Sequence, residues 1–247
     1  MIEREIKGEV LLIAEDETAV NYRWGENYPM MKPQLQVIPY TVKDDILKDV
    51  HLETASIGSQ IVPGMMFAKH PYKEKTFVEI SSFEKQMILY KQNRMMEIAR
   101  ELNAKRIEMT VELIDAQERK NNFKAKGGYG LVKANFNYHN EEVQKKCQSY
   151  YKEKCFEGLN GSAEKAKEIA MNCGLQYDED VMQLIEDRMS GNKLTNQTIR
   201  ILLSNETTSA TDIAFSATLI GTASLDANYQ SILSKREEFR LVSRLEF

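Results

Sequence analysis

Residues 213–233 read IAFSATLIGTASLDANYQSIL. When every second residue is taken from Ile213 onward, nine of eleven are apolar, and the residues between them are largely Ser, Thr, Asn and Gln. A period of two is typical of a β-strand with one buried face, because successive side chains point to opposite sides of the strand. Helical spacing would place Phe215, Leu219 and Thr222 together, which makes no apolar stripe. The run is longer than the roughly 5–6 residues of an ordinary strand, so it predicts a long amphipathic strand.

Shorter alternating runs occur at residues 107–113, 132–138, 199–203 and 239–247. Over residues 106–139 and 213–247 the order is strand, loop, strand, which predicts two hairpins on either side of a helical insertion. Strands joined in this way are usually antiparallel, and helices would cover their apolar side. The predicted fold class is therefore α+β, with a twisted, mainly antiparallel sheet, long amphipathic hairpins and helices packed on one face.

Helical periodicity is clearest from Phe83 to Leu102, where the apolar residues recur on one stripe. Ser81 and Glu84 match a capping box before this helix, and Asn103 is a suitable left-handed stop after it. Three further helices are expected in the insertion. They are one after Asn140 whose apolar stripe includes Cys147 and Cys155, one over residues 163–173 capped by Ser162, and one capped by Asp178.

The first 80 residues have short strand candidates and long irregular connections. The apolar run Val10–Ala14 predicts a buried strand, and residues 34–38 and 77–80 predict two more. Residues 15–33 are interpreted as a loop, because Pro29 and Pro33 oppose regular structure there. Length and composition fit one domain over residues 1–247, with an irregular strand-rich part at 1–80 and the helix, hairpins and helical insertion at 81–247.

Composition narrows the class of protein. The net charge of −4 lacks the broad positive field that attracts phosphate backbones, so a nucleic-acid partner is not expected. Three cysteines, none in a Cys-x-x-Cys pair, favour reduced thiols and a cytoplasmic protein. The charged N-terminus predicts no signal peptide, and no apolar run is long enough for a transmembrane helix.

No motif in the chain predicts a catalytic residue, a cofactor or a metal site. The nearest to one is Asp115 with Glu118 and Lys120, which have the residue types of a metal-dependent nuclease. A solvated hairpin tip is the favoured interpretation, because charge runs usually face water. A hydrolase or metal-dependent nuclease using these three residues is the alternative function.

The preferred hypothesis is a non-enzymatic protein that works by self-assembly or partner binding through its long hairpins, with a pore or tube as one form of assembly. The expected partners are further copies of the chain or another protein, and a membrane is a further candidate. A transmembrane barrel strand also alternates apolar and polar residues, but any antiparallel sheet does so, and the half-solvated sheet is favoured. The predicted assembly or membrane face consists of Phe215, Ala217, Leu219, Ala223, Leu225, Ala227 and Tyr229.

Overall fold

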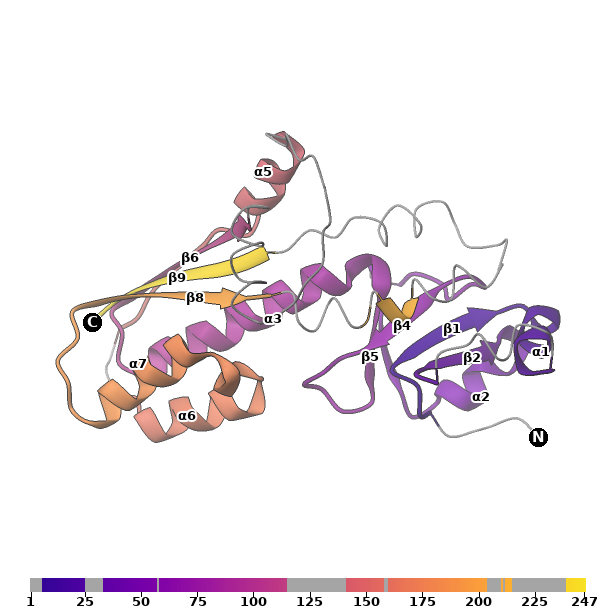
Figure 1. Cartoon of the computed structure of the whole chain (residues 1–247), viewed down its shortest axis with the longest axis horizontal. Helices are drawn as coiled ribbons and strands as arrows, with labels where there is room; N and C mark the ends of the chain where they lie inside the picture. The colour runs from indigo at the N-terminus through magenta and orange to yellow at the C-terminus, as the bar shows by residue number, and fades with distance from the viewer. Residues whose placement is uncertain are drawn as a thin grey trace, which may run out of the picture. The chain divides into compact units, whose positions relative to one another are not determined.

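The computed structural model describes residues 6–24, 33–56, 58–114, 141–157, 160–203, 210, 212–214 and 239–247 (Figure 1). The chain divides into two compact units. Unit 1 comprises residues 1–87 and 205–236, and unit 2 comprises residues 88–204 and 237–247. Helices accompany a mixed and an antiparallel sheet, which confirms the α+β class. The single domain over residues 1–247 stays a prediction.

Unit 1 contains a five-stranded mixed sheet in the order β2-β1-β4-β5-β3. The strands are β1 (Val10–Ala14), β2 (Leu35–Pro39), β3 (His51–Glu53), β4 (Met66–Lys69) and β5 (Thr76–Glu79). The pairs β1–β2 and β3–β5 are parallel, whereas β4 is antiparallel to both β1 and β5. The strands predicted at 10–14, 34–38 and 77–80 are thus present within a residue or two, and β3 and β4 were not predicted.

Both faces of β1 are buried, which explains why its sequence is continuously apolar. Val10 and Leu12 belong to one hydrophobic cluster, and Leu11 and Ile13 belong to another. Because neighbouring strand residues point to opposite faces, the two clusters lie on opposite sides of this sheet. A strand covered on both sides needs apolar residues at every position rather than at alternate ones.

The expected loop over residues 15–24 is wrong, since α1 (Asp16–Trp24) occupies it. The carboxylate of Asp16, at the start of the helix, accepts hydrogen bonds from the backbone N–H and the hydroxyl of Thr41. Ala19 and Tyr22, three positions apart, are buried in the same cluster. Two apolar contacts on a mostly polar helix make too weak a periodic pattern to recognise in the sequence. The unit also contains η2 (Tyr40–Val42) and α2 (Lys43–Leu47).

Unit 2 contains a four-stranded antiparallel sheet in the order β7-β6-β9-β8. The strands are β6 (Arg106–Leu113), β7 (Lys152–Cys155), β8 (Asn196–Leu202) and β9 (Phe239–Glu246), and the helices are α5 (Glu141–Gln148), α6 (Ala163–Asn172) and α7 (Glu179–Met189), with η3 (Leu175–Tyr177). Helix α3 (Ile80–Glu101) begins in unit 1 and continues through unit 2. A single hydrophobic cluster joins residues of α3, α6 and α7 to alternate residues of β6, β8 and β9. The predicted period of two in these strands is therefore confirmed.

The predicted ends of the helices are partly right. Asn103 has a positive φ of 60°, and the N–H of Ala104 donates to the carbonyl of Ala99, as expected of a left-handed helix stop. The Ser162 and Asp178 side chains cap α6 and α7 as expected. The capping box is wrong, because α3 already begins at Ile80 and the Ser81 hydroxyl donates to Glu79.

The helix predicted to carry Cys147 and Cys155 on one stripe is also wrong. Helix α5 ends at Gln148, and Cys155 lies exposed in β7. Strand β7 reads Lys, Glu, Lys, Cys, and such a short charged strand carries no apolar period.

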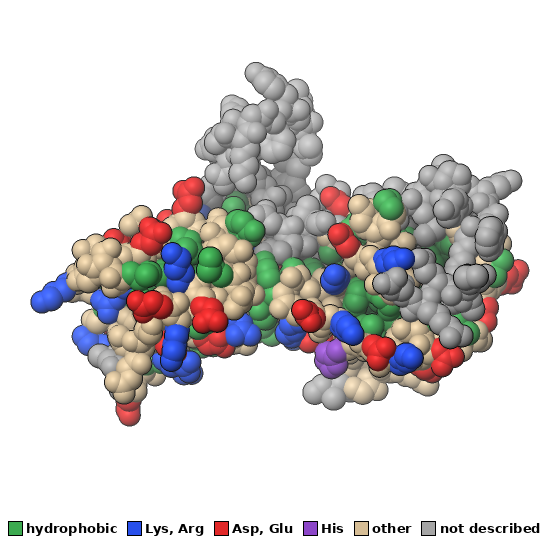
Figure 2. All heavy atoms as spheres, turned by 90° about the horizontal axis from the view of Figure 1, so that it is seen from below, with side chains coloured by type: hydrophobic (Ala, Val, Ile, Leu, Met, Phe, Trp, Pro, Cys, Tyr) green, Lys and Arg blue, Asp and Glu red, His purple; other side chains and the backbone are tan. Residues whose placement is uncertain are grey.

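On the face shown in Figure 2, charged side chains of both signs are interspersed.

The start of the predicted long strand is helical rather than extended. Ala210 and residues 212–214 have helical conformation. Ala210, Ile213 and Ala214 are all buried in one cluster of unit 1. Their spacing of three and four residues is that of one helix face, which the alternation downstream of Ile213 concealed. The rest of the run, from Phe215 onward, lies outside the described residues, so its extended conformation stays a prediction. The predicted pairing of this run with residues 239–247 in one hairpin is wrong, because β9 already pairs with β6 on one side and with β8 on the other. Long hairpins that extend beyond the sheet stay a prediction.

Candidate functional site

The residues predicted to form the functional site lie outside the described residues. This holds for the assembly or membrane face, namely Phe215, Ala217, Leu219, Ala223, Leu225, Ala227 and Tyr229, and for Asp115, Glu118 and Lys120 of the alternative enzyme hypothesis. Both sets therefore stay predictions. The structure does describe the strands from which these segments leave the sheet of unit 2, and these strands define the candidate site.

The two segments are joined to the same end of that sheet. Strand β6 pairs with β9 along its whole length, from Arg106 opposite Glu246 to Leu113 opposite Phe239. The chain leaves β6 after Leu113 toward residues 115–140, and it enters β9 at Phe239 after residues 215–238. Strand β8 ends there too, since the N–H of Leu203 donates to the carbonyl of Phe239 at 3.0 Å. Segments far apart in sequence thus start from adjacent strands.

Opposite charges fix the register of this strand pair. Arg106 faces Glu246, Glu108 faces Arg244, and Glu112 faces Arg240 across the two strands. Two of these pairs are ion pairs, with an Arg106–Glu246 distance of 3.2 Å and an Arg240–Glu112 distance of 2.8 Å. A slip by one residue would exchange the buried and the charged faces of the strand, so this pattern holds β6 and β9 in one alignment.

At the other end of the sheet, Glu153 of β7 connects the charged rows. Its carboxylate accepts a hydrogen bond from Tyr151 at 2.9 Å and forms an ion pair with Arg106 at 2.8 Å. The hydrogen bond from Tyr151 and the bond and charge of Arg106 lower the pKa of Glu153, and the same contacts raise the pKa values of Arg106 and Tyr151. A carboxylate held ionised in this way is a poor proton acceptor, which points to a structural role.

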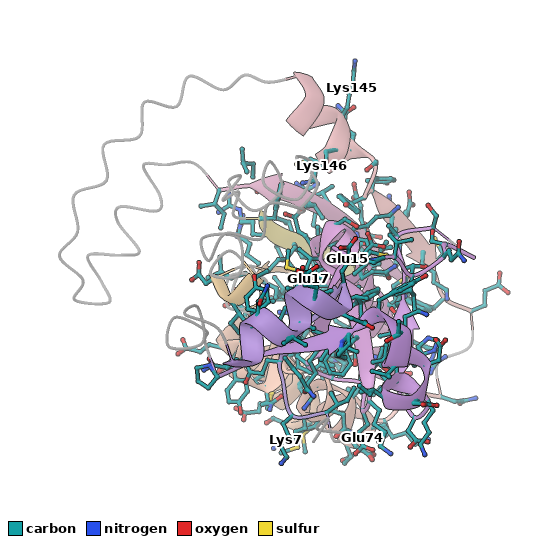
Figure 3. All side chains as sticks on the ribbon, turned by 90° about the vertical axis from the view of Figure 1, so that its right-hand side faces the viewer. Lys7, Glu15, Glu17, Glu74, Lys145 and Lys146 are labelled. Carbon is teal, nitrogen blue, oxygen red and sulfur yellow. The ribbon has the colours of Figure 1, made fainter. Side chains whose placement is uncertain are left out.

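The open end of the sheet also carries an aromatic ring and a lysine. The Lys146 ammonium of α5 lies 4.7 Å from the centre of the Phe239 ring, a cation–π distance. Lys145 of the same helix extends outward from it (Figure 3). Leu202, the last residue of β8, has 39% of its side chain exposed. Among the described residues, this end therefore carries charged and apolar groups and no arrangement of a nucleophile with a base.

A cleft of about 410 Å³ lies elsewhere in unit 2, at the C-terminal end of α3. Two of its polar side chains hold helix ends together. The Asn103 side chain accepts a hydrogen bond from the N–H of Gly161 at 2.8 Å, and the Arg188 guanidinium donates to the carbonyl of Leu102 at 2.9 Å. A side chain at Gly161 would collide with the backbone of Glu101.

The acidic and hydroxyl groups in the cleft do not form a catalytic pair. The Ser162 hydroxyl donates to the Glu164 carboxylate at 2.6 Å and accepts from the N–H of Lys165. This hydrogen bond lowers the pKa of Glu164, so the carboxylate is a weak base. A serine nucleophile needs a base that takes its proton, and a carboxylate with a lowered pKa serves poorly. The cleft is a junction of helix ends.

The histidines and cysteines that the structure describes do not assemble into a site. Cys173 is buried, and burial raises the pKa of its thiol. His70 is buried in unit 1, and its Nδ1 accepts a hydrogen bond from the N–H of Tyr72 at 3.1 Å. Within the described ranges, no group of three or more His, Cys, Asp or Glu side chains could hold a metal ion. His139 lies outside these ranges.

Comparison with known proteins adds no relative. No family model, curated protein or solved structure matches the chain. Among the described helices, none has the length and apolar character needed to cross a bilayer.

Proposed function

We propose that the chain is a non-enzymatic protein that works by self-assembly or partner binding through long amphipathic β-hairpins extending the sheet of unit 2. A pore or a tube is one form that such an assembly takes. One observation carries the proposal: the segments containing the alternating runs 132–138 and 215–233 are joined to the same end of the paired strands β6 and β9. Extended chains that start from adjacent antiparallel strands can continue the same ladder of hydrogen bonds.

The geometry of the described strands supports this extension. The β6–β9 ladder is eight residue pairs long and is aligned by opposite charges, so it provides a rigid base. A longer hairpin built on it would present one apolar and one polar face. The apolar face must then be covered by a second copy, by another protein or by lipid, because large exposed apolar patches are rare on isolated proteins.

Two further details belong to the proposal. The first is that the helices of unit 2 cover one face of its sheet, which is supported by the hydrophobic cluster that residues of α3, α6 and α7 share with alternate residues of β6, β8 and β9. The second is that the three cysteines form no disulfide, which suits a reducing compartment, so we propose that the protein is cytoplasmic.

The proposal is tested on the unmodified protein. Mass is measured by size-exclusion chromatography with light scattering, and particles are examined by electron microscopy, both with and without liposomes. We expect assemblies larger than one chain of 28.5 kDa. Dye release from the liposomes would distinguish a pore from an assembly in solution. A single-chain mass in every condition, together with no retained binding partner, would overturn the proposal.

A further inference from the structure

The outer edge of β8 is the longest unprotected strand edge among the described residues. Strand β8 has seven residues and a single charge, at Arg200. The other outer strands have features that oppose edge-to-edge pairing in natural sheets, namely short length, charged residues or a proline. Strand β3 has three residues, β7 has four of which three are charged, and β2 ends in Pro39.

Alternate residues of β8 direct their backbone groups away from β9. The N–H of Leu203 donates to Phe239, and the carbonyl of Thr195 accepts from Phe247, so the odd-numbered residues form the hydrogen-bonded pairs. In an antiparallel ladder the residues between them point the other way. Asn196, Thr198 and Arg200 therefore present three N–H and three carbonyl groups at the edge, and these groups have no hydrogen-bond partner in the described part of the chain.

The same edge is closed at one end. The carbonyl of Leu202 points outward as well, and the Lys91 ammonium of α3 lies 3.5 Å from it. Lys91 is almost completely buried, so its position is fixed by packing. The free edge therefore ends at Arg200, and any strand that pairs with it is limited to residues 196–200.

We propose that this edge pairs with β8 of a second copy of the chain, antiparallel and centred on Thr198. This register places Thr198 opposite itself and Arg200 opposite Asn196, so no like charges meet. The three outward residues of each copy would form six backbone hydrogen bonds, since every N–H finds a carbonyl. Pairing with β7 of a second copy is disfavoured, because Lys152 and Lys154 would lie beside the apolar side of β8. The inference rests on the proposed self-assembly and names one of its interfaces.

Two variants that carry charges of opposite sign at position 198, the centre of the pair, test the inference. Thr198→Lys puts two ammonium groups face to face, and Thr198→Glu puts two carboxylates there, and like charges directly opposite destabilise a strand pair. We expect the unmodified protein to reach twice the single-chain mass of 28.5 kDa at high concentration. Each variant alone should lose that species, and an equimolar mixture should regain it. Two variants that both keep the double mass would overturn the inference, as would a single-chain mass for the unmodified protein.

Two further variants at position 198 control for loss of the dimer through misfolding. Thr198 is exposed, so Thr198→Val should keep the fold and the double mass. Thr198→Pro removes an outward N–H that the single chain does not use, and proline is tolerated at such edge positions. It should abolish the pair while circular dichroism stays unchanged. If these variants keep the double mass and a hairpin variant such as Leu219→Arg abolishes assembly, the β8 interface is wrong and the proposed function stands.

Discussion

Among the described residues, His70 is the one whose ionisation most clearly opposes folding. Its side chain is 2% exposed, and burial, together with the charge of Lys73, lowers its pKa from 6.5 to about 4 despite Glu53 nearby. Between pH 6.5 and 4, the His70 imidazole is therefore protonated in the unfolded chain and neutral in the folded chain. Stability is fully present above pH 6.5 and falls as the pH drops toward 4. The total loss from this residue is on the order of 3 kcal/mol.

Urea unfolding at several pH values between 7 and 4 measures this loss. His70→Asn is the matched variant, because an Asn side-chain oxygen can replace Nδ1 as the acceptor for the N–H of Tyr72. The variant should be less stable than the unmodified protein at pH 7 and should lose less stability on acidification. Equal losses in the two proteins would show that His70 does not bind the proton.

The three cysteines should react with an alkylating reagent in the order of their exposure. Cys155 is exposed, Cys147 is half-buried against the core of unit 2, and Cys173 is 1% exposed with a raised pKa. The thiolate is the reactive form, and burial both removes it and blocks access. Mass spectrometry of a time course should show rapid modification of Cys155 and slow modification of the other two. Rapid modification of Cys173 in the native protein would contradict its burial.

At the level of elements, the sequence predicts those structures whose signal is local. Helix α3 has a regular apolar stripe, β6 alternates along its length, β9 alternates except at the buried Val242, and Ser162 and Asp178 cap the helices that follow them. Each of these patterns depends only on residues within, or next to, one helix or strand. Helix α1 and strands β3 and β4 escaped prediction because they are short, and partners distant in sequence stabilise them.

The charge pair between Glu112 and Arg240 tests the alignment of β6 with β9. Glu112→Arg places two guanidinium groups across the strands, and we expect a loss of about 1 kcal/mol in the free energy of unfolding. Adding Arg240→Glu restores opposite charges and should recover most of it. Urea unfolding measures all variants, and 1 M salt should narrow the differences because both side chains are partly exposed. A double variant no more stable than Glu112→Arg would refute this register.

For the whole molecule, the decisive pairings are not local in sequence. Leu113 and Phe239 are neighbours across the β6–β9 ladder, yet more than a hundred residues separate them. An alternating pattern identifies a strand and its buried face, but it carries no information about which distant strand lies beside it. The sequence therefore predicted the amphipathic segments themselves and could not predict that both start from one end of one sheet. The edge of β8 was equally hidden, because strand order alone makes it an edge.

The amphipathic run itself is tested by exchanging its two faces. If residues 215–233 form a regular strand, Phe215, Leu219 and Leu225 share one side and Thr218 lies on the other. Leu219→Arg should then abolish assembly or destabilise the protein, because it puts a charge where an apolar surface is covered. Thr218→Arg, the matched control, should change the measured mass and the urea midpoint only slightly. Equal effects of the two substitutions would show that the face assignment is wrong.

If the run inserts into a membrane, the residues of its apolar face must be uncharged. Residues that meet hydrocarbon cannot carry charge without a penalty of roughly 2–4 kcal/mol near the bilayer centre. Ala217→Arg and Ala223→Arg should therefore abolish dye release from liposomes, whereas Thr218→Arg, on the polar face, should leave it nearly intact. If the unmodified protein releases no dye from any lipid mixture, insertion is refuted. Covering of the apolar face by a second copy or a protein partner then remains, because that interface needs no lipid.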